Sequence, residues 1–298
     1  MFDHKKKLLA LIVGACLCTA VQAEDLTGTL KKIKESGTVT LGYRDASLPF
    51  SYLNDDQQPI GYSIELCQKI VDQIKVKVGE PNLKTQYVSV VAATRTPLLI
   101  NGTIDLECGV TTNTVERQKQ IGFLFTSYVA SAKYAVKKAS GLTSVADLKG
   151  KAVVVITGGS GEWITKNLNR EKDLGLKILN AKDSGEAFLM LETGRAVAYI
   201  NDDVQLMATI AQSRNPNAYT LLPEPMSAEP YAIGIRKNDP QFKTFADGVL
   251  SELYRSGEID TIYPKWFLKP IPPKDIVINL PMSDALIKAI AHPNDTGV

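Results

Sequence analysis

Residues 102–117 read GTIDLECGVTTNTVER and are the most informative stretch of the chain. It contains a turn at Gly102, an apolar strand over Ile104–Cys108, a loop of small hydroxyl residues and then Arg117. That order places a guanidinium and free backbone N–H groups at the carboxyl edge of a strand, where open α/β sheets bind small ligands. The stretch therefore predicts half of a carboxylate-binding site.

Strands and helices alternate ahead of this stretch. The pattern predicts a strand over Val39–Tyr43, a helix that opens at Gly61, a strand over Thr85–Val91 and a short helix over Arg95–Ile100. With the strand at Ile104–Cys108, this order is typical of a doubly wound half-sheet.

A second series of the same kind begins after Ser140. Its predicted elements are a buried strand Val153–Ile156, a helix from about Glu162, a strand Lys177–Leu179, a helix Ser184–Glu192 and a strand Ala196–Ile200 that ends at Asn201-Asp202-Asp203. Each half thus closes with a strand that delivers polar residues at its carboxyl end. Two half-sheets with facing edges predict a cleft.

The glycine loop at residues 157–161, TGGSG, lies between a predicted strand and a predicted helix. A phosphate-binding P-loop would continue with Gly-Lys-Ser/Thr, whereas Glu162-Trp163 follows here, and a Rossmann fingerprint needs a third glycine at another spacing. Small residues ahead of a helix leave its first N–H groups free for an anion. The sequence favours a carboxylate over a phosphate there, and a purely structural turn stays open.

Residues 1–23 have the features of a secretory signal peptide. Three lysines at positions 5–7 precede an apolar stretch, and Val21-Gln22-Ala23 is a small-residue cleavage site before Glu24. The apolar stretch is too short to span a bilayer. Lipid anchoring at Cys16 is the alternative, although it leaves a very short apolar region ahead of the cysteine. We expect an exported, periplasmic protein.

Loss of the signal peptide changes the composition. Of the 34 basic and 32 acidic residues, three lysines and one aspartate lie in it, so 31 of each remain and the mature net charge is near zero. This removes the electrostatic case for nucleic acid or a membrane surface as a partner.

Only His292 remains of two histidines. A Ser-His-Asp triad or a histidine zinc site in the body of the fold is therefore excluded, and we expect no cofactor and no metal.

Two cysteines, Cys67 and Cys108, remain in the mature chain. An oxidising compartment favours one disulfide between them. Two buried free thiols are the alternative, since sequence does not establish the Cα separation that a bridge requires.

The remaining length of 275 residues fits one large domain or two domains of ordinary size.

Six runs, in order along the mature chain, carry a family resemblance. They are GYSIELCQKI (61–70), NGTIDLECG (101–109), TTNTVERQK (111–119), DLKGKAVVV (147–155), TGRAVAYINDD (193–203) and SGEIDTIYPKWF (256–267). With these runs the chain resembles the periplasmic solute-binding proteins of bacterial polar amino acid ABC transporters, solute-binding family 3, and within them the glutamate/aspartate-binding proteins.

The resemblance implies a type II fold of two α/β lobes, each a mixed five-stranded sheet flanked by helices, joined by a two-strand hinge that closes on the ligand. Lobe 1 would comprise residues 24–127 and 232–298, and lobe 2 residues 128–231. The closed form would be read by ABC permease subunits in the inner membrane. The chain would need no catalytic group and would act as a monomer.

The resemblance also implies roles for single residues. Arg117 would bind the ligand α-carboxylate with Thr112 and Ser160, Asp202 would take the α-ammonium, and Arg44 and Arg95 would receive a side-chain carboxylate. Each arginine could instead be a surface charge or part of a structural ion pair. The full expected set is Arg44, Arg95, Thr111, Thr112, Arg117, Gly159, Ser160, Ser184 and Asp202.

Four pocket positions depart from the glutamate/aspartate pattern, namely Ala92, Val110, Gly159 and Ser184. They remove or replace ligand hydrogen bonds, so a related small carboxylate stays open as the ligand. A second hypothesis is an exported enzyme on the same fold, similar to a dehydratase. Without a pocket histidine, its acid or base would come from carboxylates: Glu107, Asp202, Asp203 or Glu229.

Overall fold

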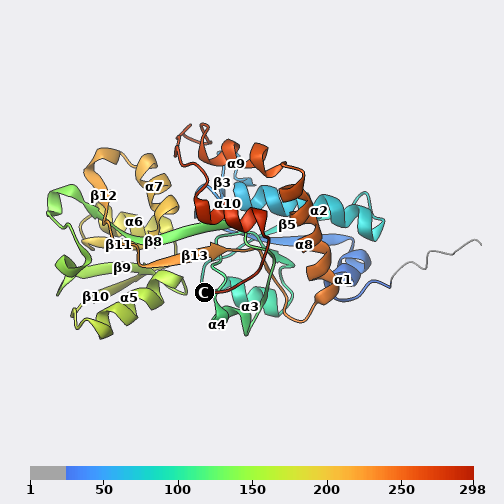
Figure 1. Cartoon of the computed structure of the whole chain (residues 1–298), viewed down its shortest axis with the longest axis horizontal. Coiled ribbons are helices and arrows are strands. Elements are labelled where there is room, and N and C mark those ends of the chain that lie inside the picture. Colours follow the sequence, from blue (N-terminus) through green and yellow to red (C-terminus); the bar gives the residue numbers. More distant parts are fainter. Residues whose placement is uncertain (1–24) are drawn as a thin grey trace, which may run out of the picture.

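The structure is a computed structural model that describes residues 25–298, so the predicted signal peptide lies outside the described residues. Figure 1 shows two α/β lobes side by side, with the long strand β8 (Tyr128–Lys137) and its antiparallel partner β13 (Ser227–Tyr231) running between them. Within residues 25–298, no helix combines the length and apolar character that crossing a membrane requires.

The first sheet is mixed and has five strands in the order β5-β1-β6-β14-β7. Strand β1 is parallel to β5 and β6, whereas β14 runs antiparallel to β6 and β7. A separate three-stranded sheet, β2-β3-β4, follows β1 in the chain. The bounds are β1 (Thr38–Tyr43), β2 (Ala46–Ser47), β3 (Ser51–Leu53), β4 (Pro59–Ile60), β5 (Lys84–Ser89), β6 (Leu106–Glu107), β7 (Gly122–Phe123) and β14 (Gly234–Ile235).

Helices from both ends of the chain belong to this lobe (Figure 1). Helix α2 starts after Gly61 and buries the positions that its sequence spacing predicts, among them Ile64, Ile70 and Ile74. Its packing partners include α1, α8 and α9. The bounds are α1 (Gly28–Ser36), α2 (Tyr62–Val78), α3 (Arg95–Ile100), α4 (Val115–Gln118), α8 (Pro240–Arg255), α9 (Ile259–Phe267) and α10 (Asp284–Ala291).

The second sheet has six strands, in the order β10-β9-β11-β8-β12 with β13 also on β8. The expectation of five strands was therefore wrong by one. Strands β12 and β13 pair with opposite ends of β8, since Leu221 is opposite Ala135 and Ser227 is opposite Ala132. The elements are β9 (Ala152–Ile156), β10 (Lys177–Ala181), β11 (Ala198–Asp202), β12 (Tyr219–Leu221), α5 (Ser160–Glu171), α6 (Ser184–Glu192), α7 (Asp203–Gln212) and the 3₁₀ turns η1 (Lys138–Ser140), η2 (Val145–Leu148) and η3 (Pro216–Ala218).

Most predicted elements are confirmed, and α3 and α6 have the predicted bounds. Several bounds near the cleft differ. Strand β6 covers only Leu106–Glu107, α5 begins at Ser160 instead of Glu162, and β11 covers Ala198–Asp202 instead of Ala196–Ile200. The earlier helix start follows from Gly159, which takes an extended N-cap conformation directly before Ser160.

Aromatic rings pack where the two linking strands leave the first lobe. The ring of Phe50 lies in edge-to-face contact with Tyr128 at 4.8 Å and with Tyr231 at 5.1 Å between centroids. The Tyr62 hydroxyl donates to the Ser127 carbonyl at 2.9 Å. Because buried aromatic pairs combine apolar burial with preferred geometry, this cluster fixes the start of β8 at Tyr128 and the end of β13 at Tyr231.

Cys67 on α2 and Cys108 after β6 form a disulfide in the structure, with 41 residues of sequence separation. Both residues are fully buried in the core of the first lobe. The bridge fastens α2 to the segment that leads into residues 109–117. Of the two alternatives left open by the sequence, the structure has the bridge.

We expect titration of the unfolded, unreduced mature protein to find no reactive thiol. A Cys67→Ala/Cys108→Ala variant should lose about 4 kcal/mol of unfolding free energy, the chain-entropy value for a loop of this length. Urea denaturation of the two proteins measures the loss. Two titratable thiols in the wild-type protein would contradict the bridge.

Candidate functional site

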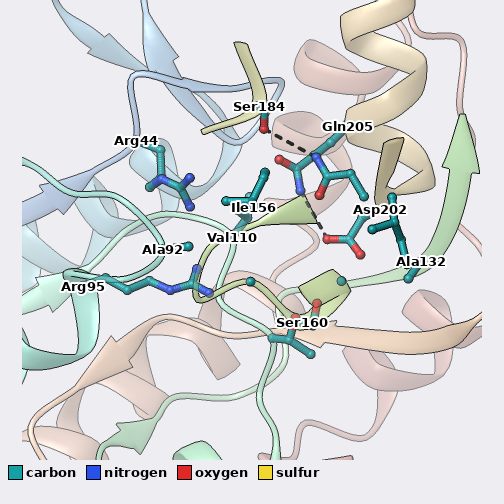
Figure 2. A pocket seen from close by; sticks show the side chains of 15 residues that line it. Arg44, Ala92, Arg95, Val110, Ala132, Ile156, Ser160, Ser184, Asp202 and Gln205 are labelled. Atoms are coloured by element: carbon teal, nitrogen blue, oxygen red, sulfur yellow. Dashed lines mark hydrogen bonds between the residues drawn. The ribbon is translucent and has the colours of Figure 1, made fainter. Parts of the chain in front are cut away.

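One cavity is lined by residues from both lobes (Figure 2). Arg44 directly follows β1, Arg95 begins α3, Ser160 begins α5 and Asp202 ends β11. The cavity therefore lies where the strand ends of the two sheets face each other, as the sequence predicts for a cleft. Its lining residues are Arg44, Ala92, Arg95, Val110, Thr112, Ala132, Ile156, Gly159, Ser160, Gly161, Ser184, Ile200, Asn201, Asp202 and Gln205.

Two buried guanidiniums, those of Arg44 and Arg95, lie on one side of the cavity (Figure 2). Burial, and then the neighbouring charge of Arg95, lower the pKa of Arg44 to about 10. Burial also lowers the pKa of Arg95. Both side chains remain cationic at neutral pH. Among the described residues, Arg95 Nη1 is buried without a hydrogen-bond partner, and this is costly unless a ligand supplies an acceptor.

Glu107 on β6 is the buried carboxylate whose charge favours the ionised form of both arginines. Its Oε2 accepts a hydrogen bond from the Thr111 hydroxyl at 2.5 Å, while its Oε1 is buried without a partner among the described residues. Gly109 leaves room for this arrangement. A Cβ there would overlap Glu107 Oε1 and lie 2.9 Å from Arg44 Cγ.

Asp202 lies on the opposite side of the cavity (Figure 2). Its Oδ2 accepts hydrogen bonds from Gln205 Nε2 at 3.2 Å and from the Tyr231 hydroxyl. Burial, and then the charge of Glu229, raise the pKa of Asp202 to about 7. A cation placed beside this carboxyl would stabilise its ionised form.

Thr112 and Glu229 join the first lobe to the linking strand β13. The Thr112 hydroxyl donates to Glu229 Oε2 at 2.6 Å, and Ser227 Oγ donates to Glu229 Oε1. Glu229 is buried but does not line the cavity. Both of its oxygens are occupied, so it holds Thr112 in place.

The amino end of α5 faces the cavity through Gly159, Ser160 and Gly161. A helix of 12 residues presents free N–H groups and a positive dipole end there. Ser184, at the start of α6, also faces the cavity and accepts a weak hydrogen bond from Asn201 Nδ2 at 3.4 Å. These groups add neutral polar contacts to the charged ones.

Two of the nine expected residues, Thr111 and Arg117, do not line this cavity. The Thr111 hydroxyl is bound to Glu107. Arg117 Nη1 donates to the Thr112 carbonyl at 2.9 Å and its Nη2 to the Gly158 carbonyl at 3.2 Å, the latter a contact between the lobes. Arg117 lines an adjoining groove that it shares with Gly159 and Ser160. It thus lies at the edge of the cavity.

Several lining residues were not among those expected from the sequence. Gln205 follows Asp202 by three positions on α7, so helical spacing could have indicated it. Ala132, Ile156 and Ile200 are apolar strand residues that resemble ordinary core positions. Nothing in their local pattern distinguishes a cavity wall from the interior of a sheet.

The structure offers little for metal or histidine chemistry. In the part of the chain that the structure describes, no group of three or more His, Cys, Asp or Glu side chains is placed to hold a metal ion. His292 is exposed near the C-terminus and does not line the cavity.

Comparison with known proteins shows the family. The pattern of the bacterial extracellular solute-binding proteins, family 3, matches residues 39–269, and this chain belongs to that family. An L-glutamate/L-aspartate-binding protein of Pseudomonas aeruginosa is 46% identical over 97% of this chain and 96% of its own length. A glutamate/aspartate import solute-binding protein of Escherichia coli strain K12 is 40% identical over 97% and 96%.

A solved structure supports the same fold. The cysteine-binding protein from Campylobacter jejuni superposes with a TM-score of 0.72 at 26% identity, covering 80% of this chain and 93% of that one. The two-lobe type II fold that the sequence predicts is thus shown. The relatives named here are binding proteins, which supports a protein that binds a solute and is not an enzyme.

Asp202→Asn should stabilise the ligand-free protein in a pH-dependent way. A carboxyl whose pKa is raised in the fold destabilises the folded state once it ionises. The penalty is absent below its usual pKa near 4, grows between pH 4 and 7, and is complete above pH 7. We expect the variant to gain about 1–3 kcal/mol at pH 8.

Thermal and urea unfolding across pH 4–8 measure this difference. The gain in unfolding free energy of the variant over the wild-type protein should shrink steadily towards pH 4. Asp55→Asn is the matched control, because Asp55 is exposed and does not line the cavity. A variant less stable than wild type at pH 8 would contradict the assignment of a destabilised carboxylate at position 202.

Proposed function

We propose that this protein is the periplasmic substrate-binding component of an amino acid ABC importer, and that it binds glutamate, aspartate or a related acidic amino acid. The observation that carries the proposal is the pair of buried guanidiniums at Arg44 and Arg95, with Arg95 Nη1 unpartnered, opposite the carboxyl of Asp202. Such a cavity is complementary to a ligand with an anionic side chain and an ammonium group.

The ligand would lie across the cavity. Its side-chain carboxylate would accept from Arg44 and Arg95, and its α-ammonium would bind Asp202. The α-carboxylate would bind the amino end of α5 at Ser160. Arg117 would complete this end, since its two printed hydrogen bonds leave further N–H donors at the edge of the cavity.

Closure would couple ligand binding to transport. In this proposal lobe 1 comprises residues 24–127 and 232–298, lobe 2 comprises residues 128–231, and β8 and β13 form the hinge. Support comes from the sheets, because the strands of the second sheet all fall within residues 128–231. ABC permease subunits in the inner membrane would read the closed form. We propose a monomer exported through cleavage after Ala23.

The choice among acidic ligands depends on four positions. Ala92 and Val110 present apolar groups to the cavity, and Gly159 and Ser184 are smaller than the side chains of the glutamate/aspartate pattern. Another small carboxylate is the second candidate ligand because of them. The enzyme alternative has no comparable support, since the relatives are named for binding and import.

Glutamate or aspartate should raise the melting temperature of the protein by binding its folded state. Arg95→Gln should weaken binding of the acidic amino acid at least about 100-fold, because the buried ligand carboxylate would then lose one of its two charged partners. Thermal unfolding with each of the twenty amino acids and small dicarboxylates measures the first effect, and isothermal titration calorimetry with the same ligands measures the second. The matched control is Arg170→Gln, since Arg170 is exposed on α5.

Which of the tested ligands bind decides between the two candidate ligand classes. Stabilisation by neutral amino acids alone would overturn the role of Arg44 and Arg95. Binding of dicarboxylates that lack an amino group, without binding of any amino acid, would favour the second candidate ligand. Equal losses in Arg95→Gln and Arg170→Gln would mean that net charge, and not the cavity, controls affinity.

Binding of an acidic amino acid near neutral pH should release a proton. The α-ammonium would lower the pKa of Asp202 from about 7, so the protonated fraction of the free protein would ionise on binding, up to about half a proton at pH 7. Titration calorimetry in buffers of different ionisation enthalpy measures the release. Asp202→Asn should abolish it, and proton uptake by the wild-type protein would contradict the proposed ammonium site.

A further inference from the structure

The last residues of the chain return to the segment that enters the binding cavity (Figure 1). The Val115 N–H donates to the backbone oxygen of Val298 at 2.9 Å, and the Val298 N–H donates to the Asn113 carbonyl at 3.1 Å. This pair of backbone hydrogen bonds, to the residues on either side of Thr114, resembles one step of a parallel ladder. It joins residues that are more than 180 positions apart in the sequence.

Side chains of the same segment reach the C-terminal residues as well. The Asp295 carbonyl accepts from Asn113 Nδ2 at 2.9 Å and from Gln118 Nε2 at 2.8 Å. The Asp295 carboxylate in turn pairs with Lys243 on α8 at 3.1 Å. The C-terminal residues are thereby fastened both to α8 and to the segment around α4.

Asn113 is held from the other side by β13. It is fully buried, and its N–H donates to the Pro230 carbonyl at 2.7 Å. Residues 113–118 therefore lie between the linking strand β13 and the C-terminal residues. This segment directly follows Thr112, which lines the cavity, and contains Arg117, whose guanidinium contacts Gly158 of the other lobe.

The C-terminal residues lie outside the general pattern of the family. That pattern ends at residue 269, and the cysteine-binding protein covers 80% of this chain. The two relatives named for glutamate and aspartate cover 97% of it and so extend beyond residue 269. Chain that follows residue 269 is thus aligned with these two relatives.

We propose that residues 295–298 form a C-terminal strap that positions residues 112–117 for ligand binding. This inference rests on the proposed function for its ligand. Four hydrogen bonds, two of the backbone and two from side chains, hold the segment in one arrangement before the ligand arrives. Without the strap, binding has to order that segment first, and the affinity falls.

The strap is tested by a chain that stops after Asn294. This truncation keeps the hydrogen bond from the Thr126 N–H to the Asn294 carbonyl and removes every contact of the strap. In the ligand-free protein, amide hydrogen exchange at residues 113–118 should become at least tenfold faster. The Kd for glutamate or aspartate should rise at least tenfold, with little change in the melting temperature.

A point variant covers the case in which truncation disturbs folding. A Cβ at Gly297 would lie 3.0 Å from Val115 N and 3.1 Å from the Thr114 carbonyl carbon, so Gly297→Val should push the strap away from the segment. Thr296→Val is the matched control. Thr296 is exposed, and this variant introduces the same valine side chain one residue earlier. The control should keep wild-type exchange and affinity.

The outcomes separate the two proposals. Faster exchange with weaker binding in both strap variants supports the strap. Unchanged exchange, or faster exchange with unchanged affinity, overturns it. If the full-length protein binds neither glutamate nor aspartate, the proposed function fails, and the exchange measurement still decides whether residues 295–298 hold the segment.

Discussion

The burial of two guanidiniums at one cavity is the constraint on which the binding site depends. Arg44 and Arg95 are almost fully removed from water, yet both stay cationic at neutral pH. Like charges in a confined, poorly solvated space are unfavourable unless an anion joins them. Glu107 supplies part of that compensation from β6, but Arg95 Nη1 is left without a partner among the described residues. A ligand carboxylate would supply the missing acceptor.

The opposite wall of the cavity buries an acidic group instead of basic ones. Asp202 is buried beside a second carboxylate, Glu229, so its proton is held to an unusually high pH. The hydroxyl of Tyr231 and the amide of Gln205 satisfy it only with neutral donors. Tyr231 also packs on Phe50 at the end of the linking strand β13. The charge state of the ligand site and the packing of the linking strand therefore share one side chain.

Local patterns predict the parts of this molecule that depend on local geometry. The bounds of α3 and α6 follow from apolar spacing and stop signals, and Arg44 and Asp202 reach the cavity because each stands at the carboxyl end of a strand. The position of the Arg117 guanidinium could not be derived in this way. It depends on the carbonyls of Thr112 and Gly158, which only the tertiary fold brings within reach. The same holds for Glu229, which meets Thr112 across 117 positions.

The apolar part of the cavity explains how so few charged groups could be selective. Ala92, Val110, Ile156 and Ile200 offer no hydrogen bonds to a ligand, so a polar atom directed at them would lose its water without replacement. Such walls penalise a misplaced carboxylate or amide more strongly than a polar wall would. In the proposed binding mode, a ligand would be accepted only when its charges coincide with the arginine pair, the amino end of α5 and Asp202. Selectivity would then arise from the apolar positions of the wall as much as from the charged ones.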